Sequence, residues 1–150
     1  MAVAFTGAKS ITNWHGPADV YALSIETARS LTARTEVGAY VAPQVVWQPR
    51  SWYGYRFGNG NEKVRAIGAG GVIRHRRGRF FVELSAGPLW SERQVPAATS
   101  QLNFVTQPGA GIYLRPHLFI TYRFAHISNG GLSSRNPGWN VSAIAVGWSF

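Results

Sequence analysis

Two residues near the C-terminus have the side chains and the spacing for acyl-transfer chemistry. His126 and Ser128 lie two positions apart in an alternating stretch from Leu118 to Ser128. In an extended strand, side chains two residues apart point to the same face and are separated by about 6.5 to 7 Å. At that spacing an imidazole can take the proton of a serine hydroxyl, and the alkoxide can attack an ester carbonyl. Such pairs also occur by chance, so the surrounding sequence has to decide.

The alternation around this pair is the reverse of that in a soluble protein. Positions 118, 120, 122 and 124 are Leu, Ile, Tyr and Phe, so His126 and Ser128 continue an apolar face, whereas Arg123 lies on the other face. A membrane β-barrel turns its apolar face to lipid and keeps a polar lumen. The pair would then lie on the lipid-facing wall, where an enzyme acting on lipid needs it. The competing interpretation is an inert polar pair at the edge of the apolar band.

Strand-like segments follow one another along the whole chain, and no stretch predicts a long helix. The sequence therefore predicts an all-β fold, an eight-stranded antiparallel up-and-down transmembrane β-barrel that forms a single outer-membrane domain over residues 1–150. The expected strands are 2–10, 18–30, 34–49, 61–74, 79–91, 101–115, 117–129 and 140–150.

The expected connections alternate in length. They are short at 31–34, 76–78 and 115–117, and long at 10–17, 50–62, 91–100 and 129–139. Outer-membrane barrels have short periplasmic turns and long outer loops, so His126 and Ser128 are expected near the outer surface. The basic run Arg74 to Arg79 falls at a short turn and is not assigned to a substrate. The lumen-facing positions predict an internal structural ion-pair network, formed by Glu26, Glu36, Glu83 and Arg123.

Composition narrows the class of protein. Charged residues are only 14% of the chain, against roughly 25% in a soluble domain. No apolar run approaches the roughly 18 residues of a spanning helix, which excludes a helical membrane protein. The absence of cysteine excludes disulfides and a thiol nucleophile. Residues 1–7 lack the basic and apolar regions of a signal peptide, which indicates either the mature form of an exported protein with an added Met or a protein that is not exported. The barrel prediction requires the mature form.

The residues around the pair resemble one known family. The run YRFAHISNGG (122–131), followed by NPGWN (136–140), is similar to the PagL-type lipid A 3-O-deacylases and their acyloxyacyl-hydrolase-like relatives. The resemblance is specific in this C-terminal part, and the rest of the chain matches in layout and length. It implies hydrolysis of an ester-linked 3-hydroxyacyl chain of lipid A in the bacterial outer membrane, without metal or cofactor. It also implies that Ser128 is the nucleophile and His126 the general base.

The resemblance extends to supporting residues. Asn129, Gly130 and Gly131 are candidates for the oxyanion site, since N–H groups of a Gly-rich turn can bind an anion. The family pattern has a glutamate at the start of the last strand, where this chain has Asn140. An Asn carbonyl can hold the tautomer of His126, as in Cys-His-Asn enzymes, but it cannot stabilise the imidazolium with a full charge. Asparagine in place of glutamate therefore affects the expected level of activity more than the expected position of the site.

The expected partners are lipids. The acyl chain of the substrate would lie along Phe124, Tyr122 and Ile120 on the apolar face, and Arg135 is a candidate ligand of the phosphates of lipopolysaccharide. The net charge of +9, carried by 13 Arg and 2 Lys, suits such an anionic lipid. No nucleic-acid-binding motif accompanies the arginines, so nucleic acid is not an expected partner. The sequence leaves the oligomeric state open, and a homodimer is one option.

Two alternatives from other classes remain open. A small structural or adhesive outer-membrane barrel would show the same alternation without any chemistry, and Ser128 would then not matter. In a soluble lipid-binding barrel the apolar side chains of alternate positions would face inward, and the protein would dissolve without detergent. A calcium-dependent outer-membrane lipase is disfavoured because the six acidic residues do not cluster.

Overall fold

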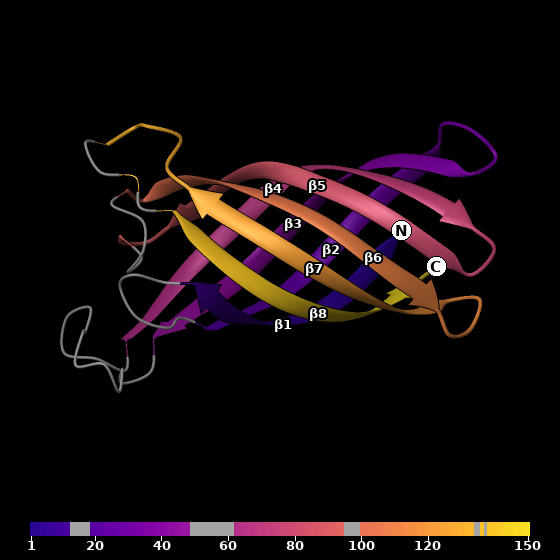
Figure 1. Ribbon diagram of the computed structural model, residues 1–150, viewed down its shortest axis with the longest axis horizontal. Helices are drawn as coiled ribbons and strands as arrows, with labels where there is room; N and C mark the ends of the chain where they lie inside the picture. The colour runs from indigo at the N-terminus through magenta and orange to yellow at the C-terminus, as the bar shows by residue number, and fades with distance from the viewer. Residues whose placement is uncertain (13–18, 49–61, 95–99, 134–135, 137) are drawn as a thin grey trace.

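The computed structural model describes residues 1–12, 19–48, 62–94, 100–133, 136 and 138–150. Each strand pairs with the next in the chain and β1 also pairs with β8, so the sheet closes into an antiparallel barrel (Figure 1). The strands are β1 (Ala2–Thr12), β2 (Asp19–Ser30), β3 (Thr35–Gln48), β4 (Glu62–Arg77), β5 (Phe80–Ser91), β6 (Leu102–Tyr113), β7 (Leu118–Ser128) and β8 (Trp139–Ser149). The expected eight-stranded barrel is confirmed, with every boundary within three residues of the prediction. Among the described residues, no helix is long and apolar enough to cross a membrane.

Side chains alternate between an apolar outer face and a small or polar interior. On β7, Tyr122 is 51% and Phe124 is 39% exposed, whereas Thr121 and Arg123 between them are buried. The same outward exposure of large apolar side chains recurs on the other strands, for example at Leu23, Ile73, Val82, Phe104 and Val146. This pattern is that of a membrane barrel. It excludes the soluble barrel, in which these large apolar side chains would face inward.

The interior is filled by side chains in successive layers. An apolar cluster lies toward the end with the long connections and includes Val46, Leu89, Ile127, Trp139 and Val141. Toward the other end the rings of Phe81, Tyr113 and Phe119 pack with centroids 5.4 to 6.0 Å apart. Glycine is required opposite these rings, because a Cβ at Gly147 would overlap Phe119 Cζ. The cavity between the layers is only about 60 Å³, so the barrel is a packed core, as expected for eight strands.

Between these layers lies the predicted ion-pair network, with Glu83 at its centre. Glu83 Oε1 accepts from Arg123 Nε at 2.6 Å, and Glu83 Oε2 accepts from Arg74 Nη2 at 2.7 Å. The Arg74 guanidinium also contacts Glu26 at 3.0 Å and Glu36 at 3.7 Å. All four predicted members are therefore present, and Arg74 joins three of them.

The expectation that Arg74 belongs to a short turn is wrong. Strand β4 continues to Arg77, three residues beyond the predicted end, so Arg74 keeps the strand parity and points into the lumen. Its guanidinium lies over the ring of Phe81, 5.0 Å from the centroid. Arg74 thus connects the ionic layer with the aromatic layer.

Replacing Glu83 by glutamine is expected to lower the free energy of unfolding by about 3 to 5 kcal/mol, because two buried arginines lose the carboxylate between them. Urea titration of the barrel refolded in lipid vesicles measures this loss. Glu36→Gln is the matched control, since the Glu36 side chain is 37% exposed and 3.7 Å from Arg74. We expect a loss below about 1 kcal/mol for that variant. Equal losses for the two variants would contradict the central role of Glu83.

The two ends of the barrel differ. The connections 31–34, 78–79 and 114–117 are short and lie at one end, together with both termini (Figure 1). At this end Phe150 N donates to Met1 O at 2.8 Å. At the opposite end β1, β3, β5 and β7 end, and the strands that follow them begin 7 to 14 residues later in the chain, which confirms the predicted alternation in length. Strand β7 ends, and β8 begins, at the end with the long connections.

Candidate functional site

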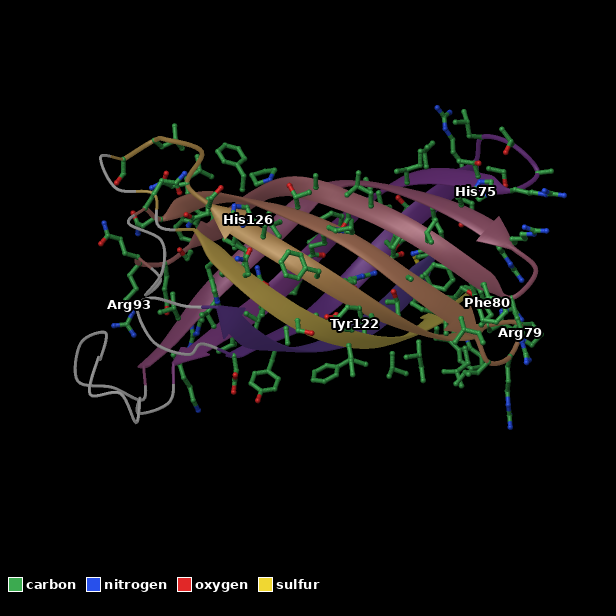
Figure 2. The ribbon with its side chains drawn as sticks, viewed as in Figure 1. His75, Arg79, Phe80, Arg93, Tyr122 and His126 are labelled. Atoms are coloured by element: carbon green, nitrogen blue, oxygen red, sulfur yellow. The ribbon has the colours of Figure 1, made fainter. Side chains whose placement is uncertain are left out.

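The candidate site is formed where β7 ends and β8 begins. The two strands are adjacent, and their register pairs His126 with Asn140 and Ile127 with Trp139. Ile127 and Trp139 point inward and are buried, so the pair formed by His126 and Asn140 lies on the outer wall. The buried residues of both strands determine which side chains face outward. Figure 2 shows His126 at the end of β7 next to the connection to β8.

A hydrogen bond orients the imidazole. His126 Nδ1 and Asn140 Oδ1 are 2.8 Å apart. A carboxamide oxygen can only accept, so Nδ1 carries the proton and the lone pair of the neutral ring is on Nε2. In this tautomer Nε2 has the lone pair that a general base needs, and the Asn140 oxygen faces Nδ1 as a carboxylate does in Ser-His-Asp triads.

Ser128 is the last residue of β7 and lies on the same face as His126. Its side chain is half-buried, and its cross-strand partner on β6 is Phe104. Within the described part of the chain, Ser128 Oγ has no hydrogen-bond partner, His126 included. Catalytic hydrogen bonds are often long or poorly aligned before substrate binds. The hydroxyl thus lies on the same face as the imidazole, two residues along the strand, beside the exposed ring of Phe104.

The turn after Ser128 is held by its own hydrogen bonds. Asn129 is fully buried; its N–H donates to Asn136 Oδ1 at 3.0 Å, and its Oδ1 accepts from Gly131 N at 2.9 Å. Gly130 and Gly131 have φ values of 62° and 85°, which favour glycine. The N–H of Gly131 would have to leave Asn129 in order to bind an oxyanion. Within the described residues, the Gly130 N–H and the Asn136 amide group are the donors of this turn without an acceptor.

Some residues of the site were not singled out from the sequence. Phe104 lies beside Ser128 and also covers the turn, because a Cβ added at Gly130 would be 3.0 Å from its ring. Gly138, with φ of 67°, lies against the imidazole, and a Cβ there would be 3.0 Å from His126 Cε1. Predicting that Phe104 lies beside Ser128 would have required the register between β6 and β7. For the positive φ of Gly138, the residue type is the only indication in the sequence.

An apolar wall leads from the site toward the middle of the barrel. Phe124, Tyr122 and Ile120 follow His126 along the outer face of β7, and Figure 2 shows Tyr122 farther from the connection than His126. Ile144 of β8, opposite Tyr122, is 59% exposed. One polar contact interrupts this wall, where Ser142 Oγ donates to Tyr122 Oη at 2.8 Å. The three residues expected to contact an acyl chain are thus contiguous with His126.

Arg135, the candidate phosphate ligand, lies outside the described residues. Among the residues that the structure describes, no group of three or more His, Asp or Glu could hold a metal ion.

Comparison with known proteins identifies one family for this sequence. The family model described as lipid A 3-O-deacylase (PagL) matches residues 33–149. A search among curated proteins finds no match.

Three solved structures, all outer-membrane or surface proteins by their descriptions, share the fold. The crystal structure of the outer membrane enzyme PagL has a TM-score of 0.66 and 17% identity, over 98% of this chain and 99% of that one. The backbone structure of the Yersinia pestis outer membrane protein Ail has a TM-score of 0.60 and 13% identity, over 99% and 97%. Neisserial surface protein A (NspA) has a TM-score of 0.52 and 10% identity, over 99% and 95%. At such identities the likeness shows the fold alone. The family model, however, covers most of the chain and includes Ser128, His126 and Asn140, so this chain belongs to the lipid A 3-O-deacylase (PagL) family.

Proposed function

We propose that the protein is a lipid A deacylase of the bacterial outer membrane, which hydrolyses an ester-linked 3-hydroxyacyl chain with Ser128 as nucleophile and His126 as general base. The observation that carries this proposal is the 2.8 Å contact between His126 Nδ1 and Asn140 Oδ1 on the outer wall, beside Ser128. A hydrogen-bonded polar pair of this kind supplies an oriented base at the edge of the lipid-facing surface. The membership of the PagL family supports the choice of substrate.

The first half of the proposed reaction forms an acyl-enzyme. His126 Nε2 takes the hydroxyl proton of Ser128 while Oγ bonds to the ester carbonyl carbon, which gives a tetrahedral intermediate. The bond from this carbon to the sugar oxygen of lipid A then breaks. The imidazolium returns its proton to that oxygen, so the sugar leaves as an alcohol. The hydroxyacyl chain stays on Ser128 as an ester.

The second half repeats these steps with water. His126 Nε2 takes a proton from a water molecule, and the hydroxide attacks the acyl-enzyme carbonyl. The Ser128 ester bond breaks, the proton passes to Oγ, and the 3-hydroxy fatty acid is released. Both tetrahedral intermediates carry an oxyanion, and the donors best suited to it are the Gly130 N–H and the Asn136 amide.

The outer wall supports the position of the acyl chain. The chain of the substrate would descend from Ser128 along Phe124, Tyr122 and Ile120, so that its carbonyl lies at the site and its tail stays in lipid. The exposed apolar area of this wall is continuous with that of Ile144 and Val146 on β8. Hydrolysis would therefore need no removal of the chain from the membrane.

The test is incubation of the refolded protein with purified lipid A in detergent, with the products read by mass spectrometry. We expect loss of one hydroxyacyl chain, and the mass lost identifies it. A fluorophosphonate, which labels activated serines, is expected to block the reaction and to modify the peptide that contains Ser128. Added chelator is expected to leave the rate unchanged, because the proposed steps use only Ser128, His126, backbone or amide donors and water.

Two results would overturn the proposal. A folded protein that leaves lipid A intact would favour the inert structural barrel. Hydrolysis with the label on a serine other than Ser128 would keep the deacylase activity but reject the nucleophile. Folding is checked independently by the heat-dependent gel mobility that β-barrels show.

Gly138→Ala is expected to lower the rate of deacylation at least about tenfold, because the added Cβ would lie 3.0 Å from His126 Cε1 and push the ring from its position. Gly78→Ala is the matched control. Gly78 has a similar φ of 62°, lies at the other end of the barrel, and has nothing within 4 Å of an added Cβ. Both variants carry the cost of the left-handed backbone, so only the contact with His126 differs. Equal activity of the two variants would contradict the proposed packing of Gly138 on the imidazole.

A further inference from the structure

The end of the barrel opposite to His126 is strongly basic. Six exposed arginines lie at this end, in the short connections or in the adjoining strand ends: Arg29, Arg34, Arg76, Arg77, Arg79 and Arg115. The acidic residues near them are Glu36, which is half-buried, and Glu26 and Glu83 inside the lumen. Asp19, Glu62 and Glu92 lie at the other end of the barrel, where β2 and β4 begin and β5 has just ended. The positive charge at this end is thus not balanced by the protein.

None of these six arginines forms an ion pair within the described part of the chain. The ion pairs of Arg74 and Arg123 lie inside the barrel. Arg76 is held in place by Gly78 O, which accepts from its Nε at 2.8 Å, and by the ring of Tyr113, 4.4 Å from its Cζ. Arg77 and Arg79, on either side of Gly78, make no such contact. Two guanidinium groups on one tight turn repel each other unless an anion lies between them.

An apolar surface begins directly at this turn. Arg77 is the cross-strand partner of Phe80, and both side chains face outward. Phe80 is 62% exposed, and Val82, the next outward residue of β5, is 57% exposed. Figure 2 shows Arg79 and Phe80 close together at the end opposite to His126. A ligand that fits this surface therefore has an anionic head at the arginines and an apolar tail along the strands.

We propose that the β4–β5 hairpin binds the headgroup phosphate of an anionic phospholipid between Arg77 and Arg79, with an acyl chain of that lipid along Phe80 and Val82. Short turns of outer-membrane barrels face the periplasm, so this lipid belongs to the leaflet opposite to lipid A. Arginine suits phosphate because its planar group donates two parallel hydrogen bonds. A free anion would explain the arginines but not the adjoining apolar strip. The proposal is independent of the deacylase chemistry.

The test is native mass spectrometry of the refolded barrel, released from detergent that contains equal amounts of phosphatidylglycerol and phosphatidylcholine with the same acyl chains. We expect the wild type to retain phosphatidylglycerol in preference. Each arginine near a membrane surface contributes about fivefold to binding of anionic lipid, so Arg77→Gln/Arg79→Gln is expected to reduce the preference at least about tenfold. Lys63→Gln/Arg65→Gln removes the same charge from the other end of β4 and is expected to keep the preference. Arg77→Lys/Arg79→Lys keeps the charge but not the pair of parallel donors of each guanidinium. Its preference for phosphatidylglycerol is expected to lie between those of the wild type and the glutamine variant.

Three outcomes would overturn the proposal. The first is equal retention of both lipids by the wild type. The second is an unchanged preference in the Arg77→Gln/Arg79→Gln variant, which would place the lipid elsewhere. The third is an equal loss of preference in the Lys63→Gln/Arg65→Gln variant, which would mean that only the net charge matters. If the glutamine variant does not fold, the lysine variant decides the test, because the proposal predicts a weaker preference for phosphatidylglycerol than in the wild type.

Discussion

Replacing Ser128 by alanine is expected to reduce the rate of lipid A deacylation by a factor of about 10⁴ to 10⁶, because loss of the nucleophile removes the covalent route. The change removes one hydroxyl from a half-buried position at the end of β7, so the barrel itself should be unaffected. The measurement is the initial rate of release of the hydroxy fatty acid, for folded protein of equal concentration. Binding of the substrate along the outer wall should persist, since Phe124 and Tyr122 are unchanged.

The matched control for this substitution is Ser149→Ala. Ser149 lies at the far end of β8, where its hydroxyl donates to His117 O at 3.4 Å. Its loss also removes one serine hydroxyl, but far from His126, and the rate is expected to stay within about twofold of the wild type. A Ser128→Ala variant that keeps a tenth or more of the activity would show that another group attacks the ester. The inert-barrel interpretation predicts no difference between the two variants, since neither would have activity to lose.

The alternation of side chains explains why the fold and the face of the site could be predicted from the sequence. Side chains two residues apart on a strand point to the same face. Tyr122 and Phe124 belong to the apolar face, so His126 and Ser128 were predicted on the outer wall with them. The adjacency of Asn140 followed from chain order, since consecutive strands of an up-and-down barrel pair with each other. Its contact with Nδ1 additionally required a register that pairs it with His126, and only the structure shows that register.

Other features depend on quantities that a pattern does not specify. The predicted end of β4 was three residues too early, so Arg74 was assigned to a turn and not to the lumen. Its ion pairs with the glutamates were therefore not predicted. Phe104 beside Ser128 depends on the register between β6 and β7. The occupation of the Gly131 N–H by Asn129 Oδ1 depends on backbone dihedral angles in the turn. Strand parity is robust to small errors in boundary, whereas register, turn geometry and strand ends are not.

Replacing Asn140 by leucine is expected to lower the rate of deacylation by about 10² to 10⁴. Leucine has a similar shape but cannot accept the hydrogen bond from His126 Nδ1, so the imidazole loses both its orientation and its preferred tautomer. Circular dichroism and gel mobility should remain those of the folded barrel, because Asn140 is on the outer wall.

The partner substitution Asn140→Asp separates two origins of this effect. With Asn140 Oδ1 facing Nδ1, the wild-type imidazole already has the tautomer that can accept the serine proton. Aspartate then adds only the stabilisation of the imidazolium, and we expect a rate within about tenfold of the wild type, on the faster side. With the amide reversed, so that Nδ2 faced the ring, the wild type would hold the wrong tautomer, and aspartate would raise the rate by up to about 10⁴. A modest gain with aspartate together with a large loss with leucine therefore supports Asn140 as a working member of the triad, whereas a large gain with aspartate would mean that the amide restrains the enzyme.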